Sequence, residues 1–144
     1  MKTILCIDDD AWVLETLMGA LIPRGYRVLV TTSTKAGPVC LKHEQVDLVL
    51  LDLNMPTKSG LTVYRELEAN AQVPVLFVTG CTRTYHEQRR DYEKEFQAVR
   101  TDLLAKPFTL AQLYQKVESL IGPGVAQPAT KGERSWFRRL FQRT

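Results

Sequence analysis

Short apolar runs that stop at a polar residue form the clearest pattern in the chain. Four such runs lead into Asp8, Asp52, Thr79 and Lys106, and they cover residues 4–7, 48–51, 75–78 and 103–105. Runs of this length with polar ends indicate buried β-strands. If the four strands are parallel neighbours, their terminal polar residues meet at one edge of one sheet. Open α/β sheets bind their ligands at that edge.

Helical periodicity fills the intervals between the runs, because apolar residues recur there three or four positions apart. Capping-type residues, proline and glycine mark the ends of these segments. The predicted helices run from Asp10 to the stop at 23–25, from 37–38 onward, from 61 to about 70, and from Leu110 to the stop at 122–124. With a further strand at 27–31, strands and helices alternate five times. This order predicts an α/β fold.

The polar residues at the strand ends bring hard oxygen ligands and one cation together. Asp8, Asp9 and Asp52 carry three negative charges when ionised, and Lys106 compensates one of them. A divalent cation would balance the remainder, and carboxylate oxygens without His or Cys favour Mg²⁺ over zinc or copper. Mg²⁺ and Lys106 would neutralise an incoming phosphoryl group, and a carboxylate held there can become an aspartyl phosphate. The pattern therefore indicates phosphoryl transfer.

Four ordered motifs in the first 122 residues resemble the receiver domain of two-component response regulators, with the single-domain chemotaxis regulators as the nearest type. The motifs are Ile4-Leu5-Cys6-Ile7-Asp8-Asp9, Asp52-Leu53-Asn54-Met55-Pro56 with Gly60, Pro74-Val75-Leu76-Phe77-Val78-Thr79-Gly80, and Lys106-Pro107-Phe108. This resemblance implies a flavodoxin-like (βα)5 fold, a doubly wound five-stranded parallel sheet with strand order 2-1-3-4-5.

The resemblance also implies a role for each residue of the pocket. Asp52 is the expected phosphoacceptor. Asp9, Asp52 and the backbone carbonyl of Asn54 are the expected Mg²⁺ ligands, with Asp8 assisting indirectly. Thr79 and Lys106 are expected to contact the phosphoryl oxygens. The implied donor is a histidine kinase or a phosphotransfer protein, and the implied output is a contact with a protein target.

Two other functions use part of the same pattern. A phosphohydrolase with an aspartyl nucleophile also needs Asp, Mg²⁺, Thr and Lys, but the haloacid-dehalogenase type has a second Asp where this chain has Asn54. The chain also offers no cap or substrate domain, so we expect no enzyme activity beyond self-catalysed phosphotransfer and dephosphorylation of Asp52. A constitutive scaffold that keeps the pocket without using it is the remaining alternative.

The chain departs from the family pattern in two places. The residue three positions before the lysine is commonly aromatic in the family and turns inward on phosphorylation, whereas here it is Leu103. Residues 84–100 form an unusually long and highly charged segment before the fifth strand. This segment is either a solvated helix with mixed ion pairs or a reshaped output surface that includes Tyr92 and Phe96. The resemblance therefore predicts the chemistry more firmly than the output.

Length and composition indicate one intracellular domain. The chain has 144 residues, enough for one core, and lacks both a signal peptide and the ~20 continuous apolar residues of a membrane span. Three cysteines without metal-ligand spacing fit a reducing compartment. These features predict a cytoplasmic protein.

The last 22 residues differ in character from the rest. We expect the receiver domain at 1–122, a Pro- and Gly-containing linker at 123–133, and a basic amphipathic helix at 134–144. On a helix, one side would carry the apolar residues Trp136, Phe137, Leu140 and Phe141, and the other the arginines, including Arg138 and Arg139. Such a segment would dock on a protein partner, on an anionic membrane or on the receiver itself, and basic charge alone supports only nonspecific nucleic-acid binding.

Overall fold

The computed structural model describes residues 1–53, 55, 60–68, 73–80, 83, 86–87 and 101–125, which contain five strands and the helices between them. The strands are β1 (Thr3–Ile7), β2 (Arg27–Thr31), β3 (Leu48–Asp52), β4 (Val75–Thr79) and β5 (Thr101–Ala105). The helices are α1 (Ala11–Leu21), the short 3-10 helix η1 (Ile22–Arg24), α2 (Ala36–His43), α3 (Gly60–Glu68) and α6 (Leu110–Ile121). Strands and helices alternate as the sequence predicts up to β4 and again from β5 to α6, whereas most residues between β4 and β5 lie outside the described part of the chain.

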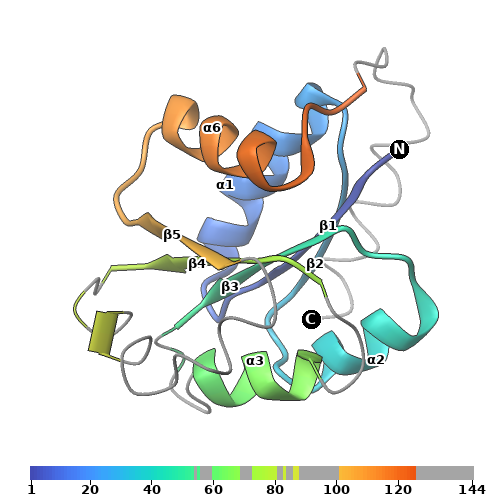
Figure 1. Ribbon diagram of the computed structural model, residues 1–144, viewed down its shortest axis with the longest axis vertical. Coiled ribbons are helices and arrows are strands. Elements are labelled where there is room, and N and C mark those ends of the chain that lie inside the picture. Colours follow the sequence, from blue (N-terminus) through green and yellow to red (C-terminus); the bar gives the residue numbers. More distant parts are fainter. Residues whose placement is uncertain are drawn as a thin grey trace.

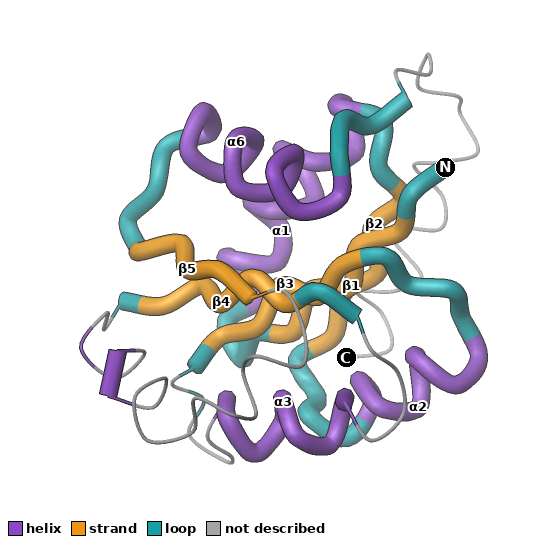
Figure 2. The backbone as a smooth tube through the Cα atoms, in the orientation of Figure 1, coloured by secondary structure: helices purple, strands orange, loops and turns teal. Residues whose placement is uncertain are grey.

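The pairings between these strands are all parallel, and the strand order is β2-β1-β3-β4-β5. Figure 1 shows α1 and α6 on one face of the sheet and α2 and α3 on the other, and Figure 2 shows the strands as the middle layer. This arrangement confirms the predicted doubly wound, flavodoxin-like sheet. Because the strands run in the same direction, all five end at one edge, which we call the carboxyl edge. They begin at the opposite edge, which we call the amino edge.

Each strand contributes alternate residues to two separate hydrophobic clusters. Ile4 and Cys6 of β1 face α1 and α6, whereas Leu5 and Ile7 face α2 and α3. The same two-residue alternation holds in β3 and β4, where every residue is buried. This explains why the strands appear in the sequence as continuous apolar runs, since both faces of the sheet are covered by helices.

The helix ends agree with the sequence signals to within about one residue, except that the predicted end of the third helix near residue 70 lies outside the described residues. The Asp10 side chain accepts a hydrogen bond from the Trp12 backbone N–H and so caps α1, and Thr109 forms a capping box with Gln112 at α6. The second helix begins at Ala36, one residue before the predicted position. Leu110 is 52% exposed rather than part of the buried face of α6, because the apolar contacts of that helix begin one turn later.

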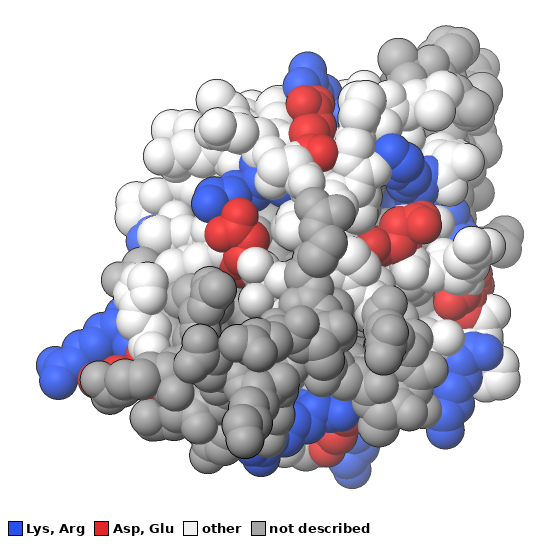
Figure 3. Space-filling view, viewed as in Figure 1, with Lys and Arg blue, Asp and Glu red and all other residues white. Residues whose placement is uncertain are grey.

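The visible surface of the described residues carries basic and acidic groups side by side (Figure 3). The described residues also form exposed ion pairs. Examples are Arg24–Glu118, Arg27–Glu44 and Lys116–Asp102, with nitrogen–oxygen distances of 3.2, 3.0 and 3.1 Å. Exposed pairs of this kind stabilise a protein by at most about 1 kcal/mol each, so the fold depends mainly on the two clusters.

The described residues include two thiols, those of Cys6 and Cys40, and they differ in burial. Cys6 is fully buried, and this burial, with Asp8 nearby, raises the pKa of its thiol far above the ordinary value. Cys40 is half-buried and packs against the cluster that faces α2 and α3. Among the described residues, no helix is both long and apolar enough to cross a membrane.

Candidate functional site

The polar residues that end four strands lie together at the carboxyl edge of the sheet. Asp8 follows β1, Asp52 ends β3, Thr79 ends β4 and Lys106 follows β5. The strand register aligns these ends, since Asp52 pairs with Val78 and the residue after it, Thr79, pairs with Ala105. The parallel sheet therefore brings together groups that are 98 positions apart in the chain at most.

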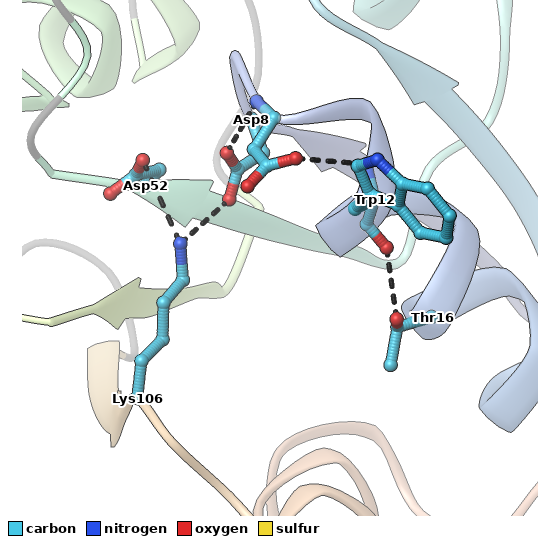
Figure 4. A network of polar contacts seen from close by, with 6 residues as sticks. Asp8, Trp12, Thr16, Asp52 and Lys106 are labelled. Carbon is cyan, nitrogen blue, oxygen red and sulfur yellow. Dashed lines mark hydrogen bonds and ion pairs between the residues drawn. The ribbon is translucent and has the colours of Figure 1, made fainter.

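The three aspartates form a compact acidic cluster in which one carboxylate oxygen of each residue lies within 4.8 Å of the others. Asp8 and Asp52 are buried, at 3% and 6% exposure, whereas Asp9 is exposed. Lys106 points its ammonium between the two buried carboxylates (Figure 4), 3.0 Å from Asp8 Oδ2 and 3.8 Å from Asp52 Oδ2. The ammonium therefore compensates part of the negative charge and lies closer to Asp8 than to the expected acceptor.

Hydrogen bonds within the loop after β1 hold the acidic residues in place. The Asp10 backbone N–H donates to Asp8 Oδ1 at 2.9 Å, and the Trp12 N–H donates to Asp10 Oδ1 at 2.9 Å. In the first turn of α1, the Thr16 hydroxyl donates to the Trp12 carbonyl at 2.9 Å (Figure 4). The first two bonds tie the acidic loop to the start of α1, and the third lies within that helix. A site that is preorganised in this way loses little conformational entropy when it binds an ion.

Lys106 and Thr79 are connected through the backbone. The Lys106 N–H donates to the Thr79 carbonyl at 2.8 Å, which extends the pairing of β4 and β5 by one residue. Thr79 is fully buried, and the peptide bond from Lys106 to Pro107 is cis. This hydrogen bond fixes the backbone of Lys106, from which the side chain extends, at the carboxyl edge of the sheet. Contact between Thr79 and a phosphoryl oxygen stays a prediction.

The pocket changes the acidity of Asp8. Burial raises the pKa of this carboxyl above its ordinary value, because a charged carboxylate is poorly solvated there, and the Asp52 charge raises it further. The hydrogen bond from the Asp10 backbone and the Lys106 ammonium oppose this rise without cancelling it. Asp8 therefore gains from any added positive charge in the pocket.

The residues present fit a magnesium ion. Three carboxylates converge, two of them buried and one open to solvent, and their oxygen atoms are the ligand type that Mg²⁺ prefers. An exposed ligand such as Asp9 also leaves room for the water molecules that Mg²⁺ usually retains. The remaining expected ligand, the backbone carbonyl of Asn54, lies outside the described residues.

The family-specific departure at Leu103 can be located in the sheet. Leu103 is half-buried, pairs in register with Phe77 of β4, and lies against the cluster that faces α2 and α3. Phe77 in turn contacts Tyr64 of α3, with ring centroids 5.7 Å apart. A leucine side chain therefore occupies the place of the expected switching ring. Most of the charged segment 84–100, including Tyr92 and Phe96, lies outside the described residues, as does Cys81.

Trp12 is a residue near the pocket that the sequence motifs did not indicate. It lies in the first turn of α1, next to the capping residue Asp10, and is 78% exposed. The signal was present in the sequence, because Trp12 falls outside the apolar stripe of Leu14, Leu17 and Leu21. An indole in this position can report changes at the acidic cluster by fluorescence.

We expect acidification to weaken Mg²⁺ binding at a higher pH than an ordinary aspartate would allow. The raised pKa of Asp8 means that its carboxyl takes up a proton above the ordinary value of 3.8, and a neutral carboxyl no longer attracts the cation. Affinity should therefore be constant near neutral pH and fall as the pH approaches the Asp8 pKa from above. Titrating Mg²⁺ against Trp12 fluorescence in Trp136→Phe at several pH values measures this. A pH-independent affinity down to pH ~4 would contradict it.

Comparison with known proteins agrees with this geometry. Residues 4–118 match the family model of the response regulator receiver domain. Among curated proteins, the transcriptional regulatory protein QseB of Haemophilus influenzae is 35% identical over 119 residues, which cover 82% of this chain and 52% of that protein. The transcriptional regulatory protein AruR of Pseudomonas aeruginosa is 30% identical over 123 residues, which cover 82% and 48%. The chain thus spans about half the length of these relatives.

Two of the solved structures with a similar fold are 27% and 25% identical in sequence to the chain. The response regulator TrrA of Thermotoga maritima, in complex with Mg²⁺ and BeF, is 27% identical with a TM-score of 0.69, covering 83% of this chain and 99% of that chain. The receiver domain of the sensor histidine kinase PA1611 of Pseudomonas aeruginosa has a magnesium ion coordinated in its active site cleft. It is 25% identical with a TM-score of 0.67, covering 84% and 98%.

Proposed function

The chain belongs to the response regulator receiver domain family, and we propose that it accepts a phosphoryl group on Asp52 in a Mg²⁺-dependent reaction. Receiver domains of this family are signalling proteins rather than enzymes with a separate substrate. The observation that carries the proposal is the position of the Lys106 ammonium, 3.0 Å from Asp8 and 3.8 Å from Asp52, beside three clustered carboxylates. A pocket with this balance of charge is suited to a phosphoryl group and a divalent cation.

In the proposed reaction, one carboxylate oxygen of Asp52 forms a bond to phosphorus while the bond from phosphorus to the donor breaks. The donor is the phosphorylated imidazole of a histidine kinase or phosphotransfer protein, and its nitrogen keeps the electron pair of the broken bond. Lys106 stabilises the negative charge of the phosphoryl oxygens, and Thr79 contributes its hydroxyl. Asp9, Asp52 and the Asn54 carbonyl, with support from Asp8, would hold Mg²⁺, which would supply the remaining positive charge. A water oxygen later bonds to phosphorus while the bond from phosphorus to the Asp52 oxygen breaks, which releases inorganic phosphate and restores the carboxylate.

Receiver domains exchange phosphoryl groups with histidine kinases or phosphotransfer proteins, and we propose the same class of donor for this chain. Together with such a donor, we propose a cytoplasmic location for the chain. The output is proposed to be a contact with a protein target, in which the tail segment 134–144 supplies a docking element through its aromatic residues Trp136, Phe137 and Phe141. These tail residues lie outside the described part of the chain, so the sequence alone supports this role. Peripheral contact of the tail with a membrane is the less favoured alternative, because one short helix binds membranes weakly.

The second candidate function is a constitutive scaffold, which Leu103 favours because a leucine cannot perform the expected ring movement. Measuring acyl phosphate formation with acetyl phosphate and Mg²⁺ separates the two functions. We expect about one phosphoryl group per chain, with incorporation that requires Mg²⁺ and disappears in EDTA. Absence of labelling in folded protein at saturating Mg²⁺ would favour the scaffold.

A further inference from the structure

A second set of contacts lies at the amino edge of the sheet, where the chain leaves α6. Residues 122–125, which we call the strap, run past the turn between η1 and β2 (Figure 1, upper right). The sequence pattern predicts that 123–125 belong to a linker. In the structure these residues make specific contacts with the fold.

Two glycines allow the strap to approach the turn at backbone distance. A Cβ atom on Gly124 would lie 2.2 Å from the Arg24 carbonyl oxygen, and a Cβ on Gly25 would lie 1.9 Å from the Val125 carbonyl oxygen. Both distances are far below any real Cβ contact, so neither position accepts a side chain without moving the strap. Gly25 also has a φ of +91°, a conformation that favours glycine. The approach is therefore reciprocal, with a glycine on each side.

Polar side chains of the fold hold the strap in place. The Tyr26 hydroxyl donates a hydrogen bond to the Gly122 carbonyl at 2.8 Å. The Lys2 ammonium donates to the Ile121 carbonyl, and it lies 3.4 Å from the Pro123 carbonyl. Tyr26 is 3% exposed, so its hydroxyl depends on the Gly122 carbonyl rather than on water.

The last turns of α6 are anchored to the same region. Arg24 forms an ion pair with Glu118 at 3.2 Å, and its guanidinium lies 4.2 Å from the ring centroid of Tyr114. The Tyr114 hydroxyl donates to the Ala20 carbonyl of α1 at 3.0 Å. The helix that leads into the strap and the turn that receives it are thus connected by independent contacts on both sides.

We propose that the strap is part of the receiver fold and fixes the point from which the C-terminal segment departs, at the edge opposite the Asp52 pocket. The domain then ends at Val125 rather than at Gly122. A five-residue strand separates the two edges by about 16 Å. The C-terminal segment therefore leaves the fold at the edge opposite the one where a phosphodonor would approach Asp52.

The reach of the chain makes this proposal measurable. A group on residue 128 lies three residues beyond Val125 and stays within about 10 Å of it. If the strap were released, the same group would be tethered at Ile121, seven residues away, and could reach about 24 Å. The volume accessible to the group would then grow about tenfold or more. The group would therefore spend much less time close to the amino edge.

The test places a nitroxide label on Pro128→Cys in the full chain with Cys40→Ser and Cys81→Ser, while buried Cys6 is left in place. In NMR spectra of this labelled chain, the amide signals of residues near the nitroxide lose intensity. We expect a strong loss at residues 1–3 and 24–27, and full intensity at Asp9 and Gly80 of the pocket edge. Equal losses at both edges would overturn the proposal.

Three further variants in the labelled chain test the strap itself. Gly124→Ala forces the strap away from Arg24, and Tyr26→Phe removes the hydrogen bond from the hydroxyl to the Gly122 carbonyl while keeping the ring. We expect each to reduce the signal loss at residues 1–3 and 24–27 at least twofold and to speed amide exchange at 122–125. Gly19→Ala is the matched control, because a Cβ there meets nothing within 4 Å, and it should change neither measurement. Unchanged signal loss in both Gly124→Ala and Tyr26→Phe would show that the strap does not set the departure point.

Discussion

Asp52→Asn is expected to abolish acid-stable, base-labile phosphorylation of the chain. Asp52 ends the central strand β3, is 6% exposed, and lies 3.8 Å from the Lys106 ammonium, so it has both a fixed position and a cation beside it. An amide in its place cannot form an acyl phosphate, because it lacks the carboxylate nucleophile. Labelling with acetyl phosphate and Mg²⁺, followed by acid and base treatment, measures the loss.

Two neighbouring substitutions act as controls with different expected effects. Asp9→Asn should mainly weaken Mg²⁺ binding, because Asp9 is the exposed member of the acidic cluster. Lys106→Ala should keep Mg²⁺ binding but impair the change that follows phosphorylation. It should also lower the free energy of unfolding by about 1–3 kcal/mol, since it leaves the buried Asp8 carboxylate without its ammonium partner. Equal labelling of Asp52→Asn and the unaltered chain would refute the assignment of the acceptor.

The sequence predicted the fold well because two kinds of periodicity were both clear. Strands covered on both faces leave continuous apolar runs, and the residues that end these runs must meet once the strands are parallel neighbours. The convergence of Asp8, Asp52 and Lys106 therefore follows from the order of apolar and polar residues along the chain. The strand order does not, since nothing in a single strand says which neighbours it has, and it came from the family resemblance.

Other features depend on tertiary contacts that no local pattern encodes. Leu110 occupies an apolar position in the helical pattern but is exposed, because burial depends on where α6 meets the sheet. Gly124 has the sequence context of a flexible linker residue, because glycine occurs both in loops and where two backbones approach closely. Only the position of Arg24 beside it distinguishes the two. The same limit applies to Leu103, whose effect on output depends on surfaces beyond the sheet.

The pocket and the strap lie at opposite edges of the sheet. The acidic cluster and Lys106 lie at the carboxyl edge, whereas Lys2, Tyr26 and Gly124 lie where the strands begin. Phosphorylation chemistry needs only the first group. A segment that leaves the fold beside the second group can bind a partner without blocking the pocket. This separation is the physical reason to expect that the tail and Asp52 can be tested independently.

Deleting residues 128–144 is therefore expected to leave Asp52 phosphorylation intact while abolishing partner recruitment or cellular positioning. The deletion keeps the strap, so the fold and its unfolding midpoint should not change. The docking energy is expected to come mainly from Trp136 and Phe141, since truncating an aromatic hot spot costs about 2–4 kcal/mol, or about 30- to 1000-fold in Kd.

A paired substitution within the full chain separates the apolar contribution of the tail from its charge. Trp136→Ala with Phe141→Ala should abolish recruitment at any salt concentration, whereas Arg138→Gln with Arg139→Gln should weaken it mainly at low salt, because exposed charges are screened. Acyl phosphate formation serves as the internal control in each variant. Loss of phosphorylation on deletion would show that the tail belongs to the pocket's chemistry. Unchanged positioning and signalling would show that it is not a docking element.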